Sequence, residues 1–327
     1  MTTLAPPVTI PATITMSMEI ITSDLTYEIF SAIQAAYGLP SVILMVFFFC
    51  FLFRKTYSNS FYRLVQLDLL VNLLCYFNSW FAVRIDKHPF AIPFLKALTY
   101  VFPKFLTWTR YFAYWFMHMQ FVSGISLSVH RLTSVYFHAT YEKLWNRYFP
   151  VYCIFCMLYC WLCNELIPGK IVEVYILNGQ LTRTNYMYVI LRAVDLTAYF
   201  GATYFVFLFV VGMLTSRMVT KKIQAASFSN GSIGKKLTKI ALTYASIYSG
   251  ILLWTVISAM NTNFHFLPEL VAKISANLLP FASDMMTLAL PYILMAYDTN
   301  IRKDLFNKVP ASQVNSRVVS SSFVITR

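Results

Sequence analysis

The sequence predicts an all-α membrane protein folded as a seven-transmembrane helix bundle, and three observations lead to this fold class. Hydrophobic residues make up 58% of the 327 residues and charged residues only 12%, about half the charged share of a soluble domain. Seven apolar stretches are long enough to cross a bilayer as helices. Lysine and arginine gather in alternate connections between these stretches, as in multi-pass membrane proteins. Lipid, rather than water, is therefore the expected solvent of most of the surface.

The seven expected spans follow one another through short connections, and no internal repeat is found. They are placed at residues 32–53, 62–83, 106–130, 148–168, 188–214, 240–260 and 274–297. The first and sixth hold no charged residue, whereas the others hold one or two each. The third begins least sharply, because the half-apolar segment "KALTYVFPKFLTW" (96–108) precedes it.

The distribution of basic residues predicts the orientation N-out, C-in. With that orientation the inner segments hold 17 lysine and arginine residues and the outer segments 7, in keeping with the positive-inside rule. We expect an extracellular N-terminal tail at 1–31, a seven-helix domain at 32–297 and a cytoplasmic C-terminal tail at 298–327. In that tail, "YDTNIRKDLFNK" (297–308) predicts a short amphipathic helix after the seventh span, lying on the inner membrane surface.

Patterns for catalysis or metal binding are not found in the sequence. The five histidines are scattered and form no HExxH motif, and no nucleophile motif or phosphate loop occurs. On a helix, Cys153, Cys156, Cys160 and Cys163 would form a stripe about 15 Å long rather than a tetrahedral metal site. We therefore expect no enzyme, no metal and no cofactor. Because the net charge of +13 is sorted across a membrane, the expected partner is the lipid bilayer and not nucleic acid.

Arg131, in "SLSVHRLTSVYF" (126–137), closes the third span with a strong cation. Two interpretations stay open. An arginine at the inner end of a helix extends to lipid headgroups as a membrane-edge anchor. Alternatively, Arg131 couples the bundle to a cytoplasmic partner when the helices move apart.

Two carboxylates, Asp68 and Asp284, fall inside expected spans, where an unpaired charge costs a few kcal/mol. Polar contacts between helices are one explanation for each of them. Alternatively, Asp68 and Asn72, which are one turn apart, form a hydrated polar network. Asp284 has no other charge in its span to neutralise it, so it is also a candidate for a ligand pocket.

The run "WTRYFAYWFMHMQF" (108–121) concentrates aromatic side chains in the outer half of the third span. Packing and anchoring at the membrane interface are the commonest roles of such residues. The same run suits a pocket for a small, partly aromatic ligand, with Arg110, Tyr114 and His118 in its wall.

Several segments of the chain are similar to one protein family. They are "YGLPS" (37–41), "SNSFYRLVQLDLLVNLLCYFN" (58–78), "HRLTSVYF" (130–137), "LTKIALTYASIYSGILLW" (237–254) and "FASDMMTLALPYILMAYDTNIRK" (281–303). Through these segments the chain resembles the nematode serpentine chemoreceptors of the Srg family, serpentine receptor class gamma or the related class V.

The resemblance implies a GPCR-like fold and a role in sensory perception and chemotaxis. It implies a small-molecule ligand bound within the helices, a heterotrimeric G protein on the cytoplasmic side, and the plasma membrane of sensory cells as location. The expected ligand pocket comprises Arg110, Tyr114, His118, Trp254 and Asp284. The expected coupling site comprises Arg131, Pro291 and Tyr292.

The chain departs from rhodopsin-like receptors at several positions. His130 stands where those receptors carry an acidic residue before the arginine of the third helix, and no cysteines are placed to form their outer disulfide. Trp254 lacks the following proline, and Pro291-Tyr292 only loosely resembles their motif at the end of the seventh helix. A small-molecule transporter or channel remains the alternative, although it predicts broken helices at the midplane and internal repeats. A membrane enzyme is the third possibility, but the sequence contains no paired carboxylates that would support it.

Overall fold

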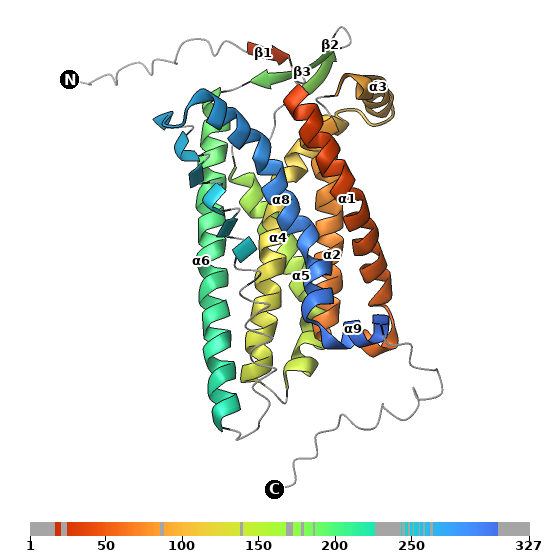
Figure 1. Ribbon diagram of the computed structural model, residues 1–327, viewed down its shortest axis with the longest axis vertical. Coiled ribbons are helices and arrows are strands. Elements are labelled where there is room, and N and C mark those ends of the chain that lie inside the picture. Colours follow the sequence, from red (N-terminus) through yellow and green to blue (C-terminus); the bar gives the residue numbers. More distant parts are fainter. Residues whose placement is uncertain are drawn as a thin grey trace, which may run out of the picture.

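The computed structural model describes residues 17–20, 25–85, 88–137, 140–167, 173–177, 180–185, 187–225 and 264–306, and isolated parts of 243–261. Within this part of the chain, long helices run side by side in a bundle, with a small β-sheet at one end and a short helix across the other (Figure 1). The two ends of the bundle are called the sheet end and the α9 end below.

Six long helices correspond to six of the seven expected spans. They are α1 (Leu25–Phe51), α2 (Ser60–Ser79), α4 (Phe105–Tyr136), α5 (Tyr141–Glu165), α6 (Met187–Ala225) and α8 (Glu269–Tyr297). The sixth expected span, 240–260, lies partly outside the described residues, and its described residues between Thr243 and Asn261 are helical. α4 contacts α2, α5 and α6, and therefore occupies the centre of the bundle.

Large apolar side chains cover the outside of the helices. Leu39 and Ile43 of α1 are 67% and 62% exposed, and Val206 of α6 is 58% exposed. Three segments, Glu28–Phe51, Ser60–Arg84 and Asp195–Met218, are long and apolar enough by composition alone to cross a membrane. Such a surface is stable in hydrocarbon, where each helix satisfies its own backbone hydrogen bonds.

The third expected span begins where a separate helix ends. The short helix α3 (Ile92–Val101) stops before Phe102, and Lys104 adopts a left-handed backbone conformation with φ 62°. α4 then starts at Phe105. The half-apolar segment at 96–108 thus belongs to two helices, with the break between them, which explains its mixed pattern.

The short helix α9 (Thr299–Phe306) follows α8 at the predicted place. Asp298 caps it, because its Oδ1 accepts hydrogen bonds from the backbone N–H groups of Asn300 and Ile301 at 2.9 and 3.2 Å. Ile301 is fully buried in the apolar cluster at this end of the bundle.

A hydrogen bond ties α9 to the turn between α1 and α2. The hydroxyl of Tyr57, in the 3-10 turn Lys55–Tyr57, donates to Asp304 Oδ2 at 2.7 Å. Burial and the adjacent Asp304 carboxylate raise the pKa of this phenol above its ordinary value. The hydroxyl therefore stays protonated and remains a donor at neutral pH.

The sheet end carries three strands that the sequence reasoning did not anticipate. β1 (Ser17–Ile20), β2 (Val174–Leu177) and β3 (Gln180–Asn185) form an antiparallel sheet in the order β1-β3-β2. In this register Glu19 lies opposite Arg183. The all-α class therefore describes the bundle, and the sheet is an addition outside it that joins the N-terminal segment to the connection between α5 and α6 (Figure 1).

Candidate functional site

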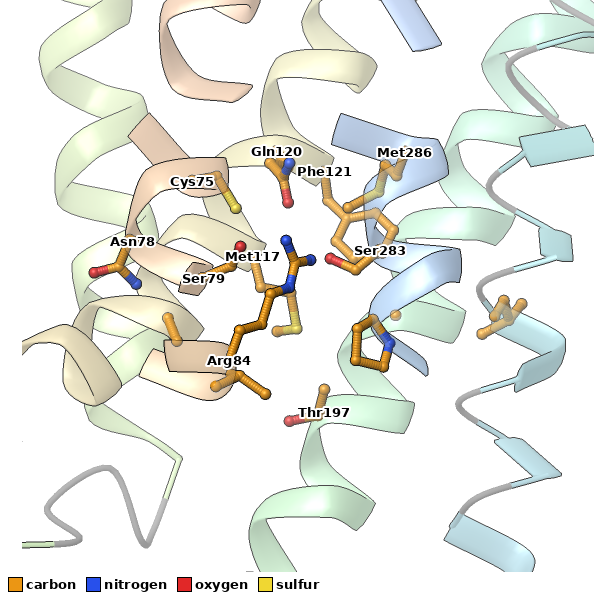
Figure 2. A pocket seen from close by; sticks show the side chains of 15 residues that line it. Cys75, Asn78, Ser79, Arg84, Met117, Gln120, Phe121, Thr197, Ser283 and Met286 are labelled. Atoms are coloured by element: carbon orange, nitrogen blue, oxygen red, sulfur yellow. The ribbon is translucent and has the colours of Figure 1, made fainter. Parts of the chain in front are cut away.

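A cavity of about 250 Å³ lies between α2, α4, α6 and α8, in the half of the bundle nearer the sheet end. Its lining is mostly apolar, with a few polar groups, and Figure 2 shows the side chains converging on it. The lining residues are Cys75, Asn78, Ser79, Val83, Arg84, Ala113, Met117, Gln120, Phe121, Thr197, Gly201, Leu252, Pro280, Ser283 and Met286. An apolar cavity with a small number of polar groups is the usual form of a small-molecule site.

Arg84 is the one charged residue among the described residues of this lining. It ends a π-helical turn (Trp80–Arg84) that continues α2. Such a turn is wider than an α-helical one and is frequent at functional sites. The Arg84 side chain is 2% exposed and extends between Met117 and Ser283 (Figure 2).

Two aromatic rings and a carboxylate hold the guanidinium group. Its central carbon lies 5.4 Å from the ring centre of Tyr76 and 5.1 Å from that of Trp80, which are cation–π distances. Its Nη2 donates to Asp284 Oδ1 in a buried ion pair between the α2 end and α8. Tyr37 of α1 donates a second hydrogen bond, 2.5 Å long, to Asp284 Oδ2.

The ion pair corrects two expectations from the sequence. Asp284 is not an isolated carboxylate, because Arg84 neutralises it. Arg84 does not belong to an exposed outer connection, where the count of basic residues had placed it, because the π-helical turn directs its side chain into the bundle. Both partners are 2% exposed, and an ion pair so deeply buried is stable only while both members are present.

The expected pocket residues Arg110, Tyr114, His118 and Trp254 are not among the described residues that line this cavity. The residues of α4 that do line it, Ala113, Met117, Gln120 and Phe121, form a stripe one position away, and on a helix that is a rotation of about 100°. Arg110, Tyr114 and His118 form a second stripe, which is outside the described lining of the cavity.

His118 shows where that second stripe points. It is fully buried, its Nδ1 hydrogen-bonds the hydroxyl of Tyr204 at 2.8 Å, and its ring stands edge-on to Phe200 of α6. Tyr204 in turn donates to Tyr159 of α5 at 3.3 Å. These contacts make His118 part of the packing between α4 and α6.

A buried polar network lies next to the cavity, toward the α9 end. Ser123 of α4 donates to Asp68 Oδ1 at 2.5 Å. Gln120 donates to Asn72 at 2.8 Å and to Thr287 of α8 at 2.9 Å. The structure thus places Asp68 and Asn72 in one network that joins α2, α4 and α8. Because Gln120 also lines the cavity, the network extends to the cavity wall.

A second polar relay lies at the α9 end and includes the position beside Arg131. Nε2 of His130 hydrogen-bonds Ser60 Oγ at 2.8 Å. Glu142 of α5 accepts from both the backbone N–H and the hydroxyl of Ser60, each at 2.7 Å. The relay joins the starts of α2 and α5 to the end of α4. His130 therefore forms a hydrogen bond between helices at the position where rhodopsin-like receptors carry an acidic residue.

The three expected coupling residues lie in the half of the bundle nearer the α9 end. The guanidinium of Arg131 lies 5.5 Å from the ring centre of Phe61. Pro291 is buried inside α8, and the neighbouring Tyr292, which is 46% exposed, shares a 2.9 Å hydrogen bond with Ser41 of α1. The structure places Arg131 next to the His130 relay. Tyr292 lies elsewhere, on the side of α8 that faces α1.

Comparison with known proteins agrees with this architecture. Squid rhodopsin superposes with a TM-score of 0.53 at 14% sequence identity, covering 86% of this chain and 83% of that one. This likeness concerns the fold alone, and it confirms the predicted seven-transmembrane, GPCR-like bundle. The protein is accordingly a multi-pass membrane protein.

Sequence comparison identifies the family. Serpentine receptor class gamma-47 of Caenorhabditis elegans is 33% identical over 272 residues, which is 83% of this chain and 88% of that protein. Serpentine receptor class gamma-53 of the same organism is 25% identical over 292 residues, 89% of this chain and 95% of that one. The family described as Srg family chemoreceptor matches residues 31–305. The resemblance drawn from the sequence is confirmed, and the chain belongs to the Srg family of chemoreceptors.

Proposed function

We propose that the protein is a chemosensory receptor that binds a small-molecule cue in the cavity beside Arg84 and signals to a heterotrimeric G protein at the α9 end. The observation that carries the proposal is a cavity with one buried cation among mostly apolar side chains, in the half of the bundle nearer the sheet end. Membership of a chemoreceptor family supports the same function. The proposal implies a receptor and no enzyme.

The lining favours a particular kind of cue. Met117, Phe121 and Met286 offer apolar contacts, and the volume of about 250 Å³ lies just below the usual range for drug-sized ligands, roughly 300–1,000 Å³. Because Asp284 balances the charge of Arg84, an uncharged cue fits better than an ion. We therefore propose a small, mostly apolar molecule with a hydrogen-bond acceptor for the Arg84 guanidinium.

The proposed orientation places the sheet end outside the cell and the α9 end in the cytoplasm. With Arg84 inside the bundle, the outer basic residues fall from 7 to 6, so the excess of the 17 inner basic residues over the outer ones rises from 10 to 11. With this orientation, residues 1–31 lie outside the cell and residues 298–327 lie inside it. The membrane is the plasma membrane of a sensory cell. The orientation also gives Arg131 and the relay through Ser60 access to a cytoplasmic G protein.

The test is a cell line that expresses the protein with a G-protein-linked reporter and is screened against pooled volatile and water-soluble cues. A cue that activates the wild type is then tested on Met117→Trp, which fills the cavity, and on Met157→Trp, an identical substitution at a 47% exposed site on α5. We expect the first variant to lose the response and the second to keep it, at equal surface density. An undiminished response of Met117→Trp would place the cue elsewhere.

A further inference from the structure

A second hollow lies on the side of α8 that faces away from the centre of the bundle. It has a volume of about 480 Å³ and is bounded by α1, α8 and the sixth-span residues Thr243 and Ile247. We call it the α1–α8 groove. Figure 1 shows α8 at the front of the bundle, between α1 and the described pieces of the sixth span. Met285 and Tyr292, both in its lining, are 64% and 46% exposed, so the groove opens to the surroundings of the bundle, which are lipid.

The groove is not a plain apolar slot, because hydroxyl groups follow its length. At its deepest point Tyr37 donates to Asp284, whose side chain is 2% exposed. Ser41 and Tyr292 share a 2.9 Å hydrogen bond further along. The described lining includes Tyr37, Ser41, Thr243, Ile247, Asp284, Met285, Leu288, Ala289, Tyr292, Ile293, Ala296 and Tyr297.

A second hydroxyl pair lies in the groove nearer the α9 end. The hydroxyls of Thr243 and Tyr297 lie 3.2 Å apart. Tyr297 lies at the last position of α8, at the α9 end of the bundle, whereas Asp284 lies near the middle of this helix. At a rise of 1.5 Å per residue, the two positions are separated by about 20 Å.

Polar groups at both ends of a lipid-facing groove constrain what fills it. Hydroxyl and carboxylate oxygens hold more lone pairs than the contacts at these sites use, and facing them with hydrocarbon is unfavourable. An ordinary acyl chain offers no hydrogen bond at the depth of Asp284. A charged group at that depth carries a penalty of several kcal/mol. The occupant that matches the groove is neutral, elongated and able to donate a hydrogen bond at each end.

We propose that the α1–α8 groove is a second ligand site that takes a neutral lipid carrying a hydroxyl at both ends, entering from the bilayer. One hydroxyl meets Thr243 and Tyr297 near the membrane surface. The other reaches mid-depth and donates to Asp284, beside the hydroxyl of Tyr37. Between them the chain lies against Leu288, the side chain at the centre of the apolar wall.

Occupancy of this site is linked to the cavity on the other side of α8. The ion pair forms the wall between them, with Arg84 in the cavity lining and Asp284 in the groove lining. A lipid hydroxyl that bonds to Asp284 shares the carboxylate with Arg84, and so alters how firmly the guanidinium is held. By linkage, a cue that binds Arg84 changes the affinity of the groove for its lipid by the same factor.

The experiment measures binding directly, without any signalling readout. The full-length receptor in phospholipid nanodiscs is exposed to a long-chain diol that carries a hydroxyl at each end, a mid-chain diazirine and an alkyne for detection. The matched probe is the mono-alcohol that lacks only the second terminal hydroxyl. After irradiation, mass spectrometry locates the label. We expect the diol to label residues 285–296 of α8 severalfold more than the mono-alcohol.

Two substitutions of alanine by tryptophan test where the lipid binds. Ala289→Trp fills the groove, and Ala35→Trp adds the same side chain at an exposed position of α1 outside it. We expect labelling by the diol to fall severalfold in the first and to stay unchanged in the second. Tyr297→Phe, which removes one of the hydroxyls that the lipid is proposed to meet with little change of shape, should lower it as well and covers the case in which Ala289→Trp does not fold.

Either of two results would overturn the proposal. Equal labelling by the diol and the mono-alcohol would mean that the groove holds only ordinary acyl chains. Labelling that persists in the folded Ala289→Trp and Tyr297→Phe variants would place the lipid elsewhere. Because neither probe requires a cue or a G protein, these results are independent of the reporter screen, and each site stands or falls alone.

Discussion

Breaking the Arg84–Asp284 ion pair from one side should destabilise the receptor strongly. Asp284→Asn leaves a guanidinium that is 2% exposed without its carboxylate, and removing one member of a buried pair costs about 3–5 kcal/mol. Arg84→Met leaves the carboxylate with only the Tyr37 hydrogen bond and should cost a similar amount. Replacing both residues, as Arg84→Met with Asp284→Leu, removes both charges together and should recover most of the loss.

Thermal unfolding of the receptor can be followed through its own cysteines. Cys75 and Cys160 are buried free thiols, so a dye that fluoresces on reaction with thiols reports unfolding of purified receptor during heating. At about 2–4 °C for each kcal/mol, the single variants should unfold on the order of 10 °C below the wild type. Met285→Ala, at the neighbouring exposed position, is the control and should unfold within a few degrees of the wild type. An unchanged midpoint in Asp284→Asn would refute the assignment of this ion pair as a structural bond.

Three further variants test the α9 end of the bundle. Arg131→Lys should reach the surface normally yet signal severalfold less, because lysine lacks the planar donors of a guanidinium; full signalling at matched density would make Arg131 a headgroup anchor. Glu142→Gln weakens the two hydrogen bonds to Ser60, so basal reporter activity should rise severalfold, and an unchanged baseline would show that the relay does not restrain the resting state. Tyr57→Phe removes the bond to Asp304, worth about 1 kcal/mol, and should speed amide exchange in 299–306; exchange at the wild-type rate would contradict the role of this bond.

The helices were predictable from the sequence because lipid imposes a simple rule on them. A stretch of about 20 apolar residues has few alternatives to a helix in hydrocarbon, so expected spans such as 32–53 and 62–83 fall on α1 and α2. The short α9 was predictable for a different reason, since Asp298 is a favourable capping residue ahead of an amphipathic turn.

The site was less predictable, because it depends on rotation and on a local change of helix type. Arg84 follows an apolar span and looks like the first residue of a loop, and no sequence rule indicates a π-helical turn there. On α4 we predicted that the aromatic stripe with Tyr114 and His118 lines the pocket, but the neighbouring Met117 and Gln120 line the cavity. Periodicity separates two such stripes but does not tell which of them faces the centre.

The sheet did leave a signal in the sequence. Asn178-Gly179 lies between the apolar run Val174–Leu177 and the mostly polar run Gln180–Asn185, and an Asn-Gly pair between two such runs is the strongest short indicator of a hairpin. We expected the connection between the fourth and fifth apolar stretches to be a loop, and the hairpin within it was therefore not predicted. The pairing of β1 with β3 had no such local indicator, because it joins residues far apart in the chain.

The sheet has a consequence for how the sheet end of this receptor is assembled. All six cysteines are free thiols, and β1 is joined to β3 through main-chain pairing over four residues. Such a clasp forms without oxidising chemistry and survives reducing conditions, unlike a disulfide. It can also open and close repeatedly within the lifetime of a single receptor, since only hydrogen bonds are broken. A proline within β3 would withdraw a backbone donor from the sheet without touching any thiol.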